Sequence, residues 1–139
     1  MNVFDFHERQ EVRADPETES LAHATIGAII EVHRHLGPGL PELSYRKALS
    51  HELTLRGIEH QCEYPVPIVY KGVRVGEGRI DIPVANRLVV EIKLVETLTA
   101  VHRAQTLTYL QLLKLQLGLL CYFNVAIMRD GIKRVINTF

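Results

Sequence analysis

The segment 88–93 constrains the fold more than any other part of this 139-residue chain. Its sequence is LVVEIK, with apolar residues at both odd and even positions. Because side chains alternate between the two faces of a strand, a strand that is apolar on both faces is covered on both faces. The segment therefore predicts a central strand of an α/β domain, with helices packed on its sheet.

The rest of the chain supplies the elements that such a domain needs, as hydrophobic periodicity and turn residues indicate. In chain order we expect helices at about 20–36 and 41–56, strands at about 62–70, 73–84 and 88–95, a helix at about 99–116, and strands at about 119–126 and 132–137. This order predicts an α/β fold with one mixed sheet flanked by helices.

Glycine, proline and asparagine mark the expected ends and irregularities of these elements. Pro65 and Pro67 suit an edge strand. Gly76 and Gly78 are expected at a bulge or bend, and Asn86 at a turn. Further expected boundaries are Gly37-Pro38-Gly39 and Gly57 after the first two helices, Gly118 after the third, and a hairpin turn at Asp130-Gly131. Residues 1–18 lack a clear period, so we expect a flexible N-terminal arm before one domain over 19–139.

The composition limits the classes of function. Sixteen basic residues balance sixteen acidic ones, which excludes a strongly basic nucleic-acid binder but leaves room for a local basic patch. Cys62 and Cys121 lie in apolar runs and are expected to be buried free thiols in a reducing compartment. No segment reaches about 20 continuous apolar residues, so we expect no membrane span and a cytoplasmic protein.

Three charged residues interrupt the apolar runs of the hairpin at 79–93: Asp81, Glu91 and Lys93. If the turn is centred on Asn86, Asp81 lies opposite Glu91, and Arg79 lies opposite Lys93. Facing carboxylates destabilise a sheet, and a hard divalent cation such as Mg²⁺ or Mn²⁺ removes that penalty. Lys93 could then hold an attacking water or stabilise developing negative charge. This chemistry suits hydrolysis of a phosphodiester bond.

Other polar residues have two interpretations that the residues alone leave open. Gln105 and Tyr109 share one helical stripe with His102, which either points at the hairpin's acids or forms the polar edge of a leucine-rich helix. Glu42 is either a site residue or an acid that stabilises a helix N-terminus. Four basic residues of the first two helices could contact phosphates but are expected on solvated helix faces: Arg34, Arg46, Lys47 and Arg56.

The segment GLPELSY, residues 39–45, matches the pattern GxxExxY and resembles the family named after it. The likeness extends over about 20–139 through the segments EVHRHLGPGLPELSY, YKGVRVGEGRIDIPV, VVEIKLVETLT, VHRAQTLTYL and GLLCYF. That family is grouped with the PD-(D/E)XK nuclease-like superfamily. Its restriction-endonuclease-like core of helix, three strands, helix and strand agrees with the predicted order.

The resemblance implies roles for six residues: Glu42 as the first-helix acid, Asp81 as the metal-binding aspartate, Glu91 and Lys93 as the (D/E)-x-K pair, and Gln105 and Tyr109 as the Q-x-x-x-Y motif of a helicase-associated exonuclease branch. Several members of that branch carry an iron–sulfur cluster on four cysteines. This chain has two cysteines, so the resemblance implies no such cluster.

We therefore expect a metal-dependent nuclease-like domain that hydrolyses DNA. Mg²⁺ or Mn²⁺ would be held by Asp81, Glu91 and the backbone carbonyl of Ile92, with Glu42 assisting through water. Lys93 would position the attacking water, while Gln105 and Tyr109 would orient the phosphate or Lys93. Two alternatives stay open: a non-catalytic nucleic-acid-binding or assembly subunit, and a nuclease acting on RNA. A homodimer also stays open.

Overall fold

The computed structural model describes residues 13–94 and 99–138 of the chain. The elements in these ranges are α1 (Pro16–Leu36), α2 (Glu42–Leu55), β1 (Tyr64–Tyr70), β2 (Val73–Ile80), β3 (Ile82–Val84), β4 (Leu88–Lys93), α3 (Ala100–Leu113), β5 (Leu117–Tyr122), the 3-10 helix η2 (Met128–Gly131) and β6 (Ile132–Ile136). The predicted α/β class and the order of the main elements are confirmed.

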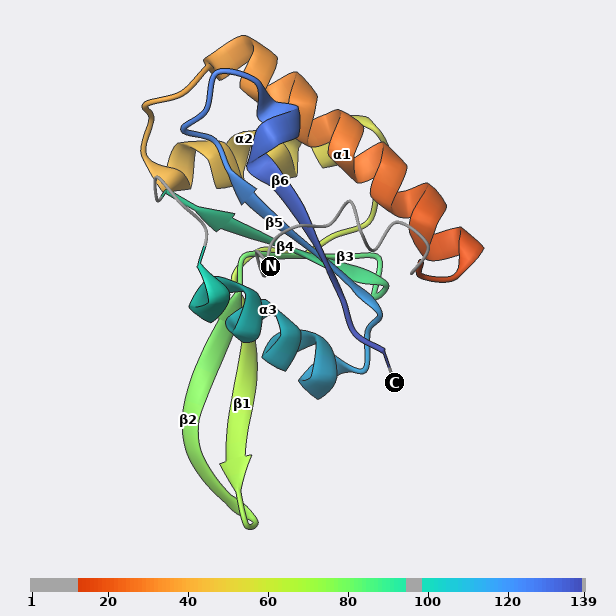
Figure 1. The fold of residues 1–139 in the computed structure, drawn as a ribbon, viewed down its shortest axis with the longest axis vertical. Coiled ribbons are helices and arrows are strands. Elements are labelled where there is room, and N and C mark those ends of the chain that lie inside the picture. Colours follow the sequence, from red (N-terminus) through yellow and green to blue (C-terminus); the bar gives the residue numbers. More distant parts are fainter. Residues whose placement is uncertain (1–12, 95–98, 139) are drawn as a thin grey trace.

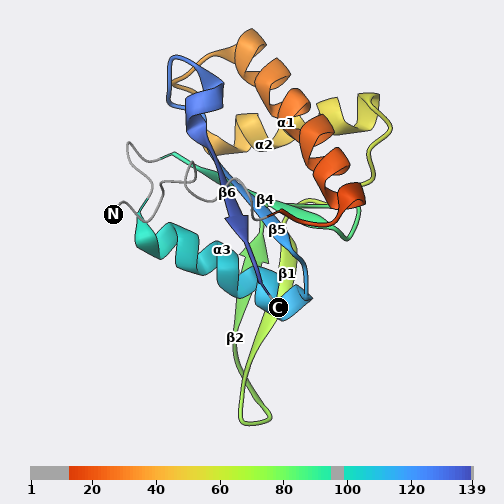
Figure 2. The ribbon, with the colours of Figure 1, turned by 45° about the vertical axis from the view of Figure 1, so that its right-hand side comes forward.

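Four strands form a mixed sheet in the order β3-β4-β5-β6. Strands β4 and β5 run parallel, whereas the two outer pairs are antiparallel. Helices α1 and α2 cover one face of this sheet and α3 covers the other (Figures 1 and 2). Val90 and Ile92 of β4 pack into the core under α1 and α2, and Val89 packs under α3. The predicted burial of β4 on both faces is confirmed.

The expected long strand at 73–84 is interrupted at Asp81, so the prediction of a single sheet is wrong. Strand β2 leaves the central sheet there and pairs with β1 as a separate two-stranded ribbon, which projects away from the rest of the molecule (Figure 1). The pairing of the ribbon shifts between Ile68 and Val69, next to the partner of Gly76. Gly78 instead leaves room for the ring of Tyr109, because a Cβ at this position would lie 2.6 Å from Cε1 of Tyr109.

Helix α1 begins at Pro16, four residues before the predicted start. Asp15 caps it, since its carboxylate accepts a hydrogen bond of 2.9 Å from the backbone N–H of Thr18. Residues 16–18 therefore belong to the helix and not to the expected arm. Residues 1–12 and the predicted strand end at Val95 lie outside the described residues.

Helix α3 is shorter than predicted and ends at Lys114, whose φ of 58° lies in the left-handed region. Gly118 is not its cap but a residue of β5. A Cβ at Gly118 would lie 2.6 Å from Cγ2 of Thr106, so the glycine allows α3 to approach the sheet closely. This close contact fixes α3 over β5, the parallel neighbour of the strand β4 that carries Glu91 and Lys93.

Three smaller expectations also fail. Cys62 is exposed, because it precedes β1, whereas Cys121 is buried in β5 as predicted. Asp130-Gly131 lies in η2 and is not a two-residue hairpin turn. Strand β5 ends at Tyr122, earlier than expected. Among the helices of the described ranges, none has the length and apolar character needed to cross a membrane.

Candidate active site

The hairpin β3–β4 brings Asp81 and Glu91 together. The turn between the strands spans residues 85–87, and Ala85 and Asn86 have φ values of 49° and 53°, a left-handed pair that matches the twist of the flanking strands. The resulting register pairs Ile82 with Val90. It is the predicted register, and it carries Asp81 to the level of Glu91.

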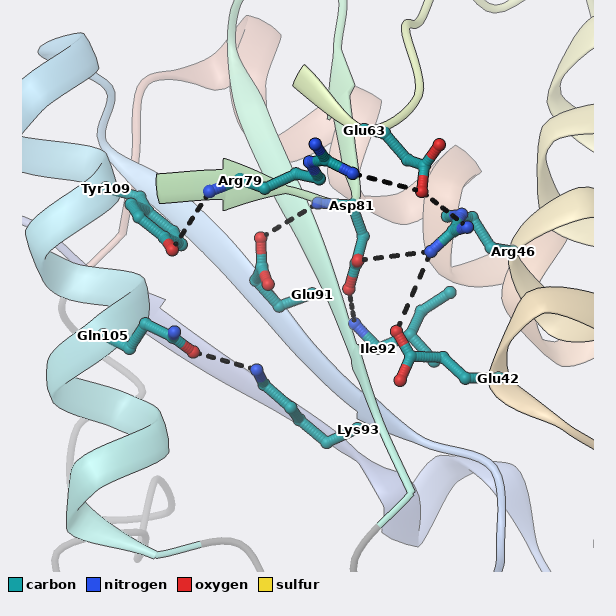
Figure 3. Close-up of polar contacts among 10 residues, drawn as sticks. All are labelled: Glu42, Arg46, Glu63, Arg79, Asp81, Glu91, Ile92, Lys93, Gln105 and Tyr109. Atoms are coloured by element: carbon teal, nitrogen blue, oxygen red, sulfur yellow. Dashed lines mark hydrogen bonds and ion pairs between the residues drawn. The ribbon is translucent and has the colours of Figure 1, made fainter. Parts of the chain in front are cut away.

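Direct hydrogen bonds lock the two acids to the backbone of the hairpin (Figure 3). The N–H of Ile92 donates to Oδ2 of Asp81 at 2.7 Å, and the N–H of Asp81 donates to Oε1 of Glu91 at 3.2 Å. The predicted opposition of Arg79 and Lys93 is wrong, because β2 has already left the sheet and Arg79 pairs with Pro65. Asp81 thus lies between β2 and β3 and belongs to neither strand.

Helix α3 contacts Lys93 and the backbone before Asp81 on one side of the site. Nζ of Lys93 donates to Oε1 of Gln105 at 2.8 Å (Figure 3). Gln105 is therefore within reach of Lys93, as the resemblance implies, although its side chain is exposed. The buried Tyr109 accepts a hydrogen bond of 3.3 Å from the N–H of Arg79 instead of contacting the acids. His102, on the same stripe, caps the start of α3 through the N–H of Thr99.

The GxxExxY segment places Glu42 on the opposite side. Gly39 adopts a φ of 97°, which favours glycine, in the loop before α2. Tyr45 is fully buried and stacks on Phe123. Its hydroxyl donates to the carbonyl of Gly37 at 2.6 Å and accepts from the N–H of Leu40 at 3.1 Å. The tyrosine thus fixes the loop that presents Glu42 in the first turn of α2.

Two further residues of this side were missed as site residues by the sequence analysis. Arg46 was expected on a solvated face, but its side chain is only 15% exposed. It lies 2.8 Å from Oε1 of Glu63, 3.8 Å from Oδ1 of Asp81 and 3.9 Å from Oε1 of Glu42 (Figure 3). The spacing of four between Glu42 and Arg46 was the available signal, because it puts both on one helical face.

Glu63 is the second of these residues, and its backbone is unusual. Its φ of 52° is rare for a residue with a long side chain. In this conformation its N–H donates to the carbonyl of Asp81 at 2.8 Å, while its carboxylate binds Arg46. Glu63 therefore joins the start of the ribbon to both Asp81 and α2.

Burial dominates the electrostatics of the acids. Glu91 is 2% exposed, and its burial, reinforced by the charge of Asp81, raises its pKa to about 8 despite Lys93. Burial also raises the pKa of Asp81, against the opposing effect of the Ile92 N–H. For Glu42, burial and then the charge of Asp81 raise the pKa. The site therefore holds carboxylates that lack sufficient positive charge or solvent to ionise easily.

The donor chemistry fits a hard divalent cation. Asp81 and Glu91 offer carboxylate oxygens beside the backbone of Ile92, and the raised pKa of Glu91 shows that this buried acid would gain from a nearby cation. Over 13–94 and 99–138, no group of three or more His, Cys, Asp or Glu residues is arranged to hold a metal ion. A cation here would accordingly use two carboxylates, a backbone carbonyl and water.

Comparison with known proteins gives one family. The family model of the PD-(D/E)XK nuclease superfamily matches residues 19–135, which include the whole site. No match was found among curated proteins or among solved structures.

Proposed function

The chain belongs to the PD-(D/E)XK nuclease superfamily, and we propose that it is a metal-dependent nuclease that hydrolyses phosphodiester bonds of DNA. The observation that carries this proposal is the pair of the half-buried Asp81 and the buried Glu91, with Lys93 two residues after Glu91 on the same strand. A fold keeps two coupled acids in a poorly solvated place only at a cost in stability, which a catalytic role accounts for.

Asp81, Glu91 and the carbonyl of Ile92 would hold the divalent cation, with Glu42 contributing through water. When bound, the cation supplies positive charge for the phosphate and lowers the pKa of a water molecule. The hydrogen bonds to the N–H groups of Ile92 and Asp81 fix the orientation of the two carboxylates before any ligand arrives.

Lys93 has the role of holding the attacking water and stabilising negative charge on the phosphate. Gln105 supports this role as an acceptor, because its hydrogen bond occupies one N–H of the ammonium and leaves two for water and phosphate. Tyr109 acts at a distance from the chemistry. By binding the N–H of Arg79, it fixes the backbone just before Asp81.

The non-catalytic alternative has support of its own. The chain has no net charge at neutral pH, so its surface offers little general attraction for nucleic acid. An assembly subunit that keeps the site would need no such attraction. The complete set of acids with Lys93 favours the enzyme, because a subunit without chemistry has no use for a lysine beside this pair of carboxylates.

A cleavage assay tests the proposal. Purified wild type and Asp81→Asn are incubated with linear, nicked, single-stranded and branched DNA and with matched RNA, in Mg²⁺, Mn²⁺ or EDTA. We expect the wild type to cut DNA only with a divalent ion and Asp81→Asn to lose cleavage. If the wild type binds DNA but cuts nothing, the non-catalytic alternative replaces the proposal. Cleavage confined to RNA would contradict the substrate class.

A further inference from the structure

Arg46 lies beside Asp81 and Glu42, with its Nη1 atom 3.8 Å from Oδ1 of Asp81. We propose that Arg46 is a positioning residue that acts as an internal counter-ion. Without metal, the charge of Arg46 neutralises the charges of Asp81 and Glu42. When a divalent ion binds, the N–H groups of Arg46 that faced these acids turn to donate to a phosphate of the substrate. This inference rests on the proposed nuclease function and names a further residue of the same site.

The contacts of the Arg46 guanidinium are unequal. One end is anchored, with Nη2 at 2.8 Å from Oε1 of Glu63. The other end is loosely placed, with Nη1 at 3.8 Å from Asp81 and 3.9 Å from Glu42. These two distances exceed those of a charge-assisted hydrogen bond. The Nη1 end can therefore leave the acids while the Nη2 end keeps its partner.

The anchor is built into the fold and does not depend on the acids of the site. Glu63 holds its position through a left-handed backbone and the bond from its N–H to the carbonyl of Asp81. Arg79 lies 3.7 Å from the same carboxylate oxygen and gives Glu63 a second cationic partner. Glu63 would thus keep its charge balanced while Arg46 changes its outer contacts (Figure 3).

A divalent ion on Asp81 and the present position of Arg46 oppose each other. Like charges a few ångströms apart repel strongly in a site that solvent screens poorly. Metal binding therefore has to displace the Nη1 end, and a guanidinium with free N–H groups matches the geometry of a phosphate. A DNA phosphate that accepts hydrogen bonds from Arg46 should therefore strengthen metal binding. By the same coupling, bound metal should strengthen DNA binding.

A simple structural role makes a different prediction. If Arg46 only ties α2 to the hairpin, its removal should loosen the carboxylates and weaken metal binding. If it is a counter-ion, its removal should strengthen metal binding in the absence of DNA. The sign of the change therefore separates the two roles.

The experiment compares wild type with Arg46→Gln and Arg46→Lys by calorimetric titration of Mg²⁺ and Mn²⁺ without DNA. Arg56→Gln is the matched control, because Arg56 pairs with Glu52 four residues earlier on α2, as Arg46 does with Glu42, but away from the acids. We expect Arg46→Gln to bind metal about 10-fold more tightly, and both Arg56→Gln and Arg46→Lys to stay near wild type.

A second titration measures binding of duplex DNA by fluorescence anisotropy in Ca²⁺, a hard ion with the same preference for oxygen ligands. Here Arg46→Gln should bind about 10-fold more weakly than wild type, with Arg56→Gln unchanged. If wild type binds metal and Arg46→Gln binds it no more tightly, this inference is wrong while the proposed function stands. If no variant binds a divalent ion, both fail.

Discussion

The two sides of the β3–β4 hairpin differ in the surroundings that they give to a carboxylate. Towards α2, Asp81 has the guanidinium of Arg46 at 3.8 Å. Towards α3, Glu91 is almost fully buried, and the ammonium of Lys93 is turned to Gln105. Lys93 opposes the rise in the pKa of both acids, but Arg46 adds its positive charge beside Asp81 and not beside Glu91. We infer that the burial of Glu91, more than the number of acids, would make a bound cation favourable at this site.

The largest expected effect comes from removing the charge of Glu91. Its pKa is about 8 in the folded chain against an ordinary value of 4.5. Between these pH values the folded state holds a proton that the unfolded state has released, so the free energy of unfolding falls as pH rises and the loss is complete above about pH 8. Glu91→Gln should abolish this loss and stabilise the metal-free protein at pH 9 by on the order of 5 kcal/mol relative to wild type.

Denaturant unfolding at pH 5 and pH 9 in EDTA measures this effect. Glu77→Gln serves as the control, since Glu77 is exposed on the ribbon and pairs with Arg74. Its free energy of unfolding should follow that of wild type at both pH values. An equal pH dependence in wild type and Glu91→Gln would show that the contrast between the two sides is wrong.

A smaller effect comes from disturbing the α3 side alone. The ring of Tyr109 lies against Gly78, where a Cβ would come within 2.6 Å of it. Gly78→Ala should therefore displace Tyr109 and cost about 2 kcal/mol of stability. Gly76→Ala is the matched control on the same strand, because its Cβ would meet Ile68 at an ordinary 3.7 Å.

Thermal unfolding of both glycine variants provides the measurement, together with metal titration. Gly78→Ala should lower the melting temperature by several degrees, while Gly76→Ala should stay near wild type. Arg46 and its acids lie on the other side of the hairpin, so metal affinity should change less than stability. Equal melting temperatures for the two variants would refute the assigned packing of Tyr109.

The smallest effect is the response of stability to metal. Mg²⁺ or Mn²⁺ at ten times its Kd should stabilise wild type by about 1.4 kcal/mol, which corresponds to a rise of roughly 4 °C in Tm. Asp81→Asn should lose this response without losing stability in EDTA, because an amide oxygen can still accept the N–H of Ile92. Differential scanning calorimetry measures the melting temperature with and without metal. An undiminished metal response in Asp81→Asn would show that Asp81 does not bind the metal.

The sequence predicted the hairpin at the centre of this site because the information there is local. Apolar residues at both odd and even positions identified β4, and Asn86 fixed the turn, so the pairing of Ile82 with Val90 followed. The residues alone left the direction of Gln105 open, and the family resemblance implied that it orients the phosphate or Lys93, which it contacts in the structure. The predictions that succeeded depended on periodicity and on one tight turn.

The α2 side could not be predicted in the same way, because its contacts are tertiary. Helical spacing places Arg46 on the face of Glu42, but it does not reveal that this face meets Asp81. The departure of β2 at Asp81 depends on packing of the ribbon's base against Tyr109, which no local pattern records. Glu63 was hidden for the same reason, since its left-handed backbone is set by the carbonyl of Asp81.

The role proposed for Lys93 is tested by single-turnover cleavage of labelled DNA in Mg²⁺ and Mn²⁺ by wild type, Lys93→Ala and Lys93→Arg. The positive charge of Lys93 adds nothing to the binding of a metal cation. Lys93 should therefore act by stabilising the transition state. Lys93→Ala should keep the fold, metal binding and DNA binding but cut about 100-fold more slowly, a loss of about 3 kcal/mol. Lys93→Arg should recover little of that rate, because a guanidinium differs in shape and hydration. Wild-type rates in Lys93→Ala would contradict the account.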